Sequence, residues 1–241
     1  MTLPVLLEGV FSLLLPAVCC ACGSSETDKE YRLLCSACET CVPFSKPPWC
    51  SVCGQTLFGL GAGIDRCREC RSQRYFFDQA LGACSYEGVA KQLVVSLKYK
   101  KRLSIAPFLG EMLCRMVCQR LGADPADMVV PVPLHPVRFR ERSFNQAELL
   151  ARIVSMKIGR PLRNDLLARP RATRSQAELD KKQRYLNVRD AFEPAKDSWI
   201  PGARVLLVDD VFTTGATANA CAKRLKEAGA EKVIVVTIAH G

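Results

Sequence analysis

The chain has no uninterrupted apolar run of 18 residues, although 49% of its 241 residues are hydrophobic. A helix that crosses a bilayer needs about 20 mostly apolar residues, so the sequence predicts no membrane span. No lysine or arginine precedes Lys29, and Glu8 interrupts the apolar start of the chain. A secretory signal needs a positively charged beginning, so we expect a cytoplasmic protein in which residues 2–18 form a short helix.

Acidic residues are also few, at 24 against 34 lysines and arginines, which gives a net charge of +10. Residues 1–77 hold 7 basic and 7 acidic residues and are neutral overall, whereas residues 134–189 hold 14 and 5, a net +9. Such a basic segment favours a polyanionic partner. The change in composition near residue 77 predicts two parts, a cysteine-rich module of residues 1–77 and a basic domain of residues 78–241.

Cysteine, in contrast, is abundant, with 14 in the chain and 10 of them before residue 78. Eight form four Cys-x2-Cys pairs in two evenly built groups: Cys19, Cys22, Cys35 and Cys38, then Cys50, Cys53, Cys67 and Cys70. Each pair directs two thiolates at one ion, and two pairs complete a tetrahedron. The spacing therefore predicts two structural Zn²⁺ sites, whose metal would stabilise segments too short to bury a core.

Other uses of these cysteines fit less well. Disulfides are disfavoured because regular pairs without an export signal are typical of metal sites. An iron–sulfur cluster needs a tighter spacing than this. The spacing leaves open which pairs share an ion, and it gives no role to Cys20 or Cys41. The neutral charge of the module favours a structural brace or a protein contact over phosphate binding.

Residues 204–217 are the most informative stretch. An apolar run at residues 204–208 predicts a buried strand that ends at two adjacent acids, and a hydroxyl-rich loop then leads into a helical pattern over residues 216–228. Unpaired N–H groups at a helix start, with the helix dipole, favour phosphate, while paired carboxylates suit sugar hydroxyls or a bound Mg²⁺. The predicted ligand is a ribose 5-phosphate, bound by Asp209, Asp210, Thr213, Thr214, Gly215, Ala216 and Thr217. An ordinary capped corner would not require paired acids.

A second stretch, residues 128–146, predicts a strand that ends in a rigid loop. Prolines at 131 and 133 do not fit a sheet centre, so Val132, Pro133, Leu134 and His135 are expected beyond the strand. We expect His135 near a ligand rather than at a plain surface, because it follows a strand end. Ser143 is expected to cap a helix over residues 145–158.

The remaining pattern alternates strands and helices. Strands are expected at residues 79–86, 166–169, 191–192 and 233–238, and helices at residues 88–99 and 104–121. This order predicts an α/β domain with a mostly parallel sheet flanked by helices, and a ligand at the carboxyl ends of its strands. Residues 97–102 carry four cations and one tyrosine. They suit either phosphate or base binding or a solvated helix end.

Residues 205–217 resemble the phosphoribosyl-diphosphate (PRPP) signature of type I phosphoribosyltransferases. With Leu-Lys-Tyr at residues 97–99, Pro-Val-Pro-Leu-His at 131–135, Arg-x-Arg-x-Arg-x-Phe-Asn-Gln at 138–146 and the cysteine pairs, nearly the entire chain resembles the ComF family of competence-associated proteins. The resemblance implies a type I phosphoribosyltransferase-like fold preceded by a double zinc-ribbon module.

The same resemblance implies binding of PRPP with Mg²⁺ and phosphoribosyl transfer to an acceptor that the sequence does not identify. Asp209 and Asp210 would hold the ribose hydroxyls, and residues 132–135, with His135, would hold the pyrophosphate. A mobile loop over residues 171–187 would close on the site with Arg174 and other cations, although a solvated charged helix also fits this segment. The alternative is a non-catalytic nucleotide or single-stranded DNA-binding protein in DNA uptake or utilisation, with DNA-uptake proteins as partners.

Overall fold

The computed structural model describes residues 18–25, 33–57, 63–171, 190–195 and 198–241. All but the last residue of the predicted N-terminal helix lies outside these ranges, as do Arg174 and the other cations of the predicted mobile loop. No helix in the described ranges combines the length and apolar character that a bilayer crossing requires.

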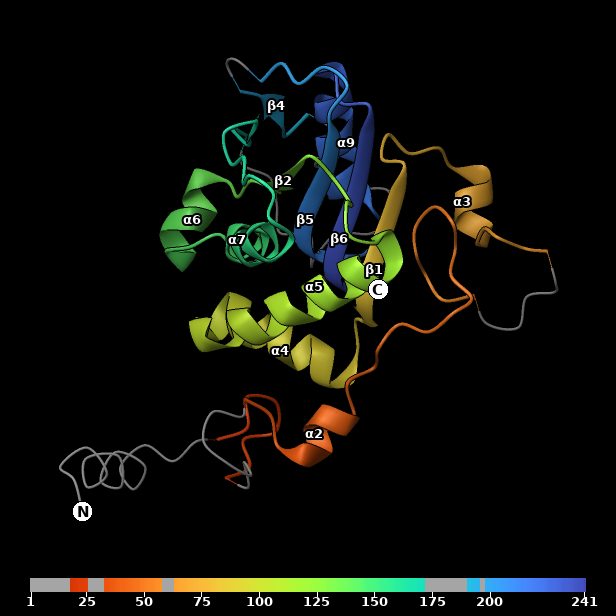
Figure 1. The fold of residues 1–241 in the computed structure, drawn as a ribbon. Coiled ribbons are helices and arrows are strands. Elements are labelled where there is room, and N and C mark those ends of the chain that lie inside the picture. The colour runs from red at the N-terminus through yellow and green to blue at the C-terminus, as the bar shows by residue number, and fades with distance from the viewer. Residues whose placement is uncertain (1–17, 26–32, 58–62, 172–189, 196–197) are drawn as a thin grey trace.

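A four-stranded parallel sheet forms the centre of the molecule (Figure 1). Its strands lie in the order β1 (Gln79–Ser85), β6 (Lys232–His240), β5 (Arg204–Phe212) and β2 (Met128–Pro131). Alternate residues of β5 enter different apolar clusters, Leu206 and Val208 on one face and Val205 and Leu207 on the other. Both faces are therefore buried, as the continuous apolar runs predicted.

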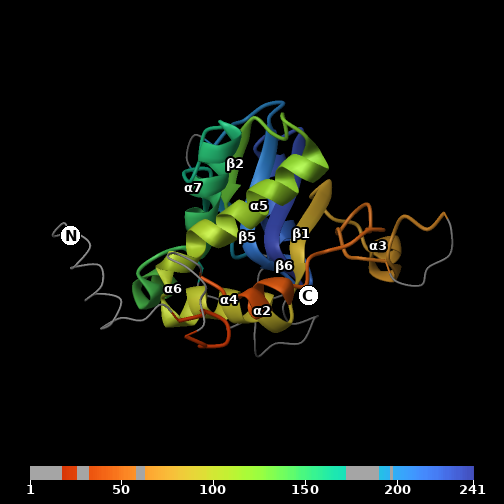
Figure 2. The same ribbon diagram turned by 60° about the horizontal axis from the view of Figure 1, so that its bottom comes forward.

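Helices cover the two faces unequally. Helices α4 (Gly88–Lys100), α5 (Ala106–Leu121) and α7 (Gln146–Ile158) share the cluster of Leu206 and Val208, and Figure 2 shows α5 crossing in front of the strands with α7 beside β2. A 3₁₀ turn, Leu103–Ile105, links α4 to α5. On the other face lie α9 (Ala216–Glu227) and a small antiparallel pair, β3 (Leu167–Ala168) with β4 (Glu193–Pro194). The predicted α/β architecture is confirmed.

Two strand predictions need correction. β5 runs past residue 208, because its pairing with β6 continues from Asp209 opposite Thr237 to Phe212 opposite His240. The acid pair therefore lies within the strand rather than after it. Residues 191–192 do not re-enter the main sheet, since the following residues form β4, which pairs only with β3 in the described chain.

The cysteine-rich module, with helices α2 (Ser36–Thr40) and α3 (Arg68–Ser72), covers the outer edge of β1. Ser45 donates its N–H to the Ala83 carbonyl at 2.9 Å, and Ser85 donates to the Pro43 carbonyl at 2.9 Å. Near the start of the strand, the Ala80 N–H donates to the Val52 carbonyl at 2.7 Å. Covering an edge strand blocks unwanted pairing, which supports the brace interpretation of the module. The division at residues 77 and 78 stays a proposal, because both apolar clusters span it.

Candidate functional site

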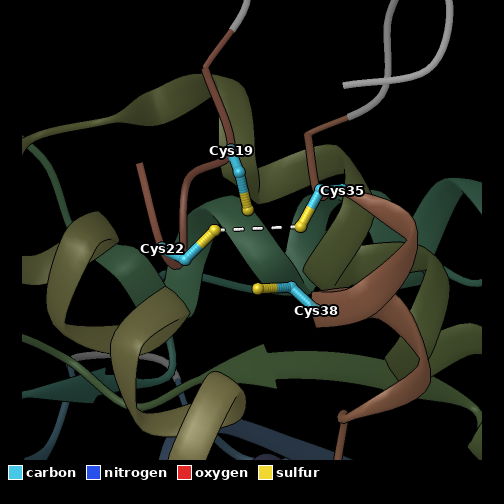
Figure 3. Close-up of side chains that lie close together, drawn as sticks. All are labelled: Cys19, Cys22, Cys35 and Cys38. Carbon is cyan, nitrogen blue, oxygen red and sulfur yellow. Dashed lines mark hydrogen bonds between the residues drawn. The ribbon is translucent and has the colours of Figure 1, made fainter. Parts of the chain in front are cut away.

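The eight paired cysteines form two compact clusters. The Sγ atoms of Cys19, Cys22, Cys35 and Cys38 lie within 4.8 Å of one another and point inward (Figure 3). Those of Cys50, Cys53, Cys67 and Cys70 also lie within 4.8 Å of one another. The Cys22 and Cys35 sulfurs are 3.8 Å apart, and those of Cys53 and Cys67 are 3.7 Å apart. Tetrahedral zinc at about 2.3 Å from each sulfur requires sulfurs about 3.8 Å apart, so both clusters fit Zn²⁺.

This geometry settles the pairing that the spacing left open, because each cluster joins two consecutive pairs. Cys20 is buried beside the first cluster and Cys41 is exposed after α2, and neither joins a cluster in the described chain. The clusters also differ in setting. Cys22 of the first cluster is exposed, whereas all four cysteines of the second are buried.

The predicted ligand residues within the described chain line one cavity of about 460 Å³. They are Asp209, Asp210, Thr213, Thr214, Gly215, Ala216 and Thr217 with Val132, Pro133, Leu134 and His135. The cavity lies where β5 and β2 reach their carboxyl ends, as open parallel sheets favour. Two segments far apart in the sequence therefore meet at one site.

A tight turn joins β5 to α9 at this cavity. Gly215 has φ +72°, and a Cβ there would lie 2.6 Å from Cζ of Phe212. Glycine is required both by the left-handed backbone and by this close approach. The Thr214 hydroxyl accepts a hydrogen bond from the Ala216 N–H at 3.4 Å. α9 thus begins at the cavity wall, where its dipole favours an anion.

The acid pair is not a free dianion. Lys98 of α4 forms an ion pair through its Nζ with Oδ2 of Asp210, and the side chains of Lys98 and Asp210 are only 18% and 5% exposed. Burial alone would lower the pKa of Lys98, but the carboxylates of Asp210 and Asp209 outweigh it and raise that pKa. Lys98 is therefore a cation in direct contact with the acid pair.

The two carboxyls have opposite pKa displacements. Burial raises the pKa of Asp209 well above its usual value, and the charge of Asp210 adds to this. Burial would also raise the pKa of Asp210, but the Lys98 ammonium outweighs it and lowers that pKa. Oδ1 of Asp209 accepts the N–H of Asp210 at 2.8 Å. Burial, the neighbouring charge and Lys98 therefore move the pKa values of the two carboxyls apart.

Asn145 holds the other side of the cavity in place. Its Nδ2 donates to the Val132 carbonyl at 3.0 Å, and its Oδ1 accepts the Ala147 N–H at 3.0 Å. Asn145, not Ser143, therefore caps α7. The Ser143 prediction is wrong because residues before it form a further helix, α6 (Pro136–Arg142), which Ser143 ends in a left-handed conformation with φ +70°.

Both ring nitrogens of His135 are occupied. Nδ1 accepts the Val137 N–H at 3.2 Å, which leaves the proton on Nε2, 3.3 Å from the Pro170 carbonyl. His135 thereby begins α6 and links it to the residues after β3. In this conformation it lines the cavity.

Guanidinium groups gather at the same cavity. It is lined by Arg138, Arg142 and Arg169. The Arg142 guanidinium lies 5.2 Å from the ring centroid of Tyr99, and its Nη1 donates to Gln146 at 3.1 Å. The cavity therefore combines carboxylates, cations and a helix start, a set that suits a ligand with both hydroxyls and phosphates.

Lys98, Asn145 and Arg169 were missed as site residues in the sequence. Lys98 had a signal, since it lies four residues after Val94 and thus continues the buried stripe of α4. A cation on an apolar stripe needs a buried partner. Asn145 and Arg169 had no comparable signal, because their roles depend on segments distant in sequence.

Two family models match the chain. A phosphoribosyl transferase domain matches residues 149–241, and a double zinc ribbon domain matches residues 10–79. The second match agrees with the two Cys₄ clusters, so the double zinc ribbon is confirmed. Among solved structures, a PRPP amidotransferase from B. subtilis is similar, at 22% identity over 59% of this chain and 30% of that chain, with a TM-score of 0.40.

Curated relatives cover most of the chain. Competence protein F of Haemophilus influenzae is 30% identical over 211 residues, which is 86% of this chain and 90% of the relative. The DNA utilization protein YhgH of Salmonella typhi is 30% identical over 84% of this chain and 94% of its own length. Competence protein ComFC of Bacillus subtilis is 34% identical over 44% of this chain and 41% of its length. With its zinc ribbons and its phosphoribosyltransferase-like sheet, this chain belongs to the ComF family.

Proposed function

We propose that the cavity binds PRPP with Mg²⁺, or another ribose 5-phosphate ligand, and that the protein transfers the phosphoribosyl group to an acceptor. One observation carries the proposal: Asp209 and Asp210 share a single cavity with the helix start at residues 213–217 and with residues 132–135. The match to a phosphoribosyl transferase domain supports it.

The helix start would hold the 5-phosphate. Thr213, Thr214 and Thr217 offer hydroxyl groups, and the first turn of α9 offers its dipole and its backbone N–H groups. Gly215 allows the backbone to turn tightly without a side chain between Phe212 and the ligand. No base or acid is needed at this end of the ligand, so its contribution is binding and orientation.

The acid pair would orient the ribose diol. Carboxylate oxygens are suitable acceptors for two hydroxyls and suitable ligands for Mg²⁺, so Asp209 and Asp210 fit this ion. Mg²⁺, when bound, would neutralise charge on the diphosphate. As positive charge develops at the sugar carbon, ionised Asp210 would stabilise it, and Lys98 would keep that buried carboxylate ionised before the ligand binds.

The opposite side would receive the leaving group. In the proposed reaction the bond from sugar C1 to the diphosphate oxygen breaks, pyrophosphate leaves with the electron pair, and an acceptor nucleophile forms the new bond to C1. Residues 132–135 and the guanidinium groups of Arg138, Arg142 and Arg169 would hold the pyrophosphate. Arg174, outside the described residues, is proposed to join them.

The binding step is tested by calorimetric titration of PRPP and Mg²⁺ into the zinc-loaded protein. The double variant Asp209→Asn with Asp210→Asn should abolish binding. The exposed Asp165, paired with Arg163 outside the cavity, gives a matched control, so Asp165→Asn should bind normally. Unchanged binding by the double variant would refute the assignment of the acid pair.

Transfer is tested separately by PRPP-dependent pyrophosphate release across a panel of bases and amines. Release with one acceptor and none with the double variant would support turnover. Binding without release for every acceptor would favour a protein that holds the ligand without reacting it.

A second candidate function is binding of single-stranded DNA. Tyr99 lines the cavity with 64% of its surface exposed, and the exposed cations Lys100 and Lys101 follow it directly. An exposed ring among cations suits base stacking with phosphate contacts. The relatives named for competence and DNA utilisation support this function and, with it, partners among DNA-uptake proteins.

Fluorescence anisotropy of a labelled oligothymidylate over a salt series tests this second function. Affinity should fall steeply with salt, since phosphate contacts release counterions. Tyr99→Ala should weaken binding at every salt concentration without changing the slope, because it removes stacking and no charge. Weak binding that does not depend on salt would contradict direct DNA binding.

A further inference from the structure

The second cysteine cluster lies on the same face of the sheet as the helix start at residues 213–217. Its four cysteines share one buried apolar cluster with Phe77, Phe212 and Ala216. The first cysteine cluster belongs to the apolar cluster of the opposite face, with α4 and α5. The two zinc ribbons therefore support different parts of the domain.

Three aromatic rings connect the second ribbon to the turn. Tyr75 stacks on Phe77 with ring centroids 4.6 Å apart, and Phe77 meets Phe212 edge to face at 5.8 Å. On its other side Phe212 packs against His240 at 4.6 Å. The Phe212 ring is also the group that a Cβ at Gly215 would strike. The ring that shapes the turn is thus clamped from the ribbon side by Phe77.

Polar contacts run alongside this aromatic contact. The Phe76 N–H donates to Oδ1 of Asn219 at 2.6 Å, and Asn219 is only 3% exposed. Two turns further along α9, Lys226 forms an ion pair with Asp78 at 2.8 Å. Asn219 lies in the first turn of α9 and donates its own N–H to the Gly215 carbonyl at 2.8 Å. Residues 76–78 therefore follow one face of α9 from the turn toward its far end.

The first ribbon makes a different set of contacts. The Ser96 hydroxyl of α4 donates to the Cys20 carbonyl at 3.5 Å, and Leu34 packs in the apolar cluster of α4 and α5. These contacts run to α4 and α5, in the apolar cluster opposite the one that holds Ala216. The first ribbon offers an internal reference for effects of the second ribbon.

We propose that the second cysteine cluster, when it holds its metal, fixes the turn at residues 213–217 in its ligand-binding conformation, with Phe77 and Asn219 as positioning residues. The role as a ligand site rests on the proposed function. Short cysteine-rich segments fold only with their metal, so its loss would release residues 75–78. Phe212 and the first turn of α9 would then lose the contacts on one side. The affinity for the ligand would fall in proportion to the fraction of molecules in which the turn is ordered.

Hydrogen exchange of the amides of residues 211–219 tests the proposal directly and does not depend on any ligand. Phe77→Leu keeps an apolar side chain but loses the edge contact with Phe212. We expect faster exchange in these residues, two zinc ions per chain, and a loss of about tenfold in affinity for PRPP with Mg²⁺. Leu34→Ala, a buried change in the first ribbon, should leave the exchange of residues 211–219 at the rate of the unchanged protein.

Two further variants keep the test decisive if Phe77→Leu folds poorly. Asn219→Ala removes the hydrogen bond from the Phe76 N–H, and Cys70→Ser should lower the zinc content to one ion per chain. Both should speed exchange in residues 211–219. Exchange at the original rate in folded Asn219→Ala and Cys70→Ser would overturn the proposal. Faster exchange in a protein that never binds PRPP would instead refute the proposed function alone.

Discussion

The cavity has two walls that are built in different ways. The contiguous wall consists of residues 209–217, one uninterrupted stretch that ends β5 and begins α9. The assembled wall consists of Lys98 of α4, residues 132–135 after β2, and Asn145 before α7. A single turn fixes the first, whereas the second depends on how three separate elements pack.

The two walls are nevertheless coupled through charge. Asp210 of the contiguous wall lies buried against Lys98 of the assembled wall. Neither group is stable alone in such a setting, because a buried charge requires a partner. We therefore expect a change in either wall to lower both the stability of the other wall and the binding of ligand. Single substitutions can test how far this coupling extends.

The largest effect is expected for Lys98→Met, which leaves the buried Asp210 carboxylate without its cation. Breaking a buried pair from one side typically costs about 3–5 kcal/mol, measured here as the free energy of unfolding in denaturant. Lys91→Met is the control, since Lys91 is an exposed lysine on the same helix. Adding Asp210→Asn to Lys98→Met should restore much of the loss. Equal stability of the two lysine variants would show that the walls are independent.

Gly215→Ala should act almost as strongly and from the contiguous wall. A Cβ in the left-handed region costs about 1–2 kcal/mol, and the contact with Phe212 adds to that cost. Gly159→Ala is a matched control, because Gly159 has φ +66° but no neighbouring atom within 4 Å of a built Cβ. The excess destabilisation of Gly215→Ala over Gly159→Ala isolates the Phe212 contact. Equal losses of stability in the two variants would show that the Phe212 contact does not restrict the side chain at residue 215.

Asn145→Ala should destabilise the assembled wall by about 1–2 kcal/mol, through loss of a helix cap and of the bond to Val132. Asn145→Ser separates the two roles, since serine can still cap α7 but is too short to reach the Val132 carbonyl. The serine variant should recover stability and yet bind PRPP with Mg²⁺ more weakly. If Asn145→Ser recovers both stability and binding of PRPP, the only role of Asn145 is to cap α7.

The smallest expected effect is a pH dependence of stability from Asp209. Its pKa is higher in the folded protein than in the unfolded chain, so the folded state holds the extra proton and stability falls as pH rises through that interval. Asp209→Asn should remove this fall and should melt at a higher temperature than the unchanged protein at pH 7, with little change at pH 4.

Asp165→Asn should show the opposite sign. A hydrogen bond from Arg163 lowers the pKa of Asp165, so its contribution is present near pH 7 and is lost as pH falls. Thermal melts of both variants from pH 4 to pH 8 check the pair of predictions. A drop in the stability of Asp209→Asn at pH 7 would mean that the Asp209 carboxylate is itself stabilising.

The contiguous wall could be predicted from sequence because every part of it is local. The apolar run, the acids, the small loop and the helix start occur in order, and each has its own physical signature. The zinc clusters were predictable for the same reason, since cysteine spacing alone fixes two thiolates on one turn. Even there the end of β5 was placed four residues too early, because its continued pairing depends on β6.

The assembled wall was predicted only in part. The prolines predict the loop at residues 132–135, but the sequence pattern gives no helix at residues 136–142, so the expected cap falls on Ser143 instead of Asn145. Lys98 was noted as one of several cations without its partner, because Asp210 is more than a hundred residues away in the sequence. Local patterns do not encode which distant groups a fold brings together.

The placement of β1 has a consequence for how the chain is made. One edge of β1 is covered by residues 43–45, which precede it, while its other edge pairs with β6, and Asp78 and Val233 at this junction are 155 residues apart. During translation the ribbons can therefore bind zinc and shield one edge of β1 long before its partner strand leaves the ribosome. Zinc shortage during synthesis, which would leave both ribbons without metal, should then increase aggregation of nascent chains.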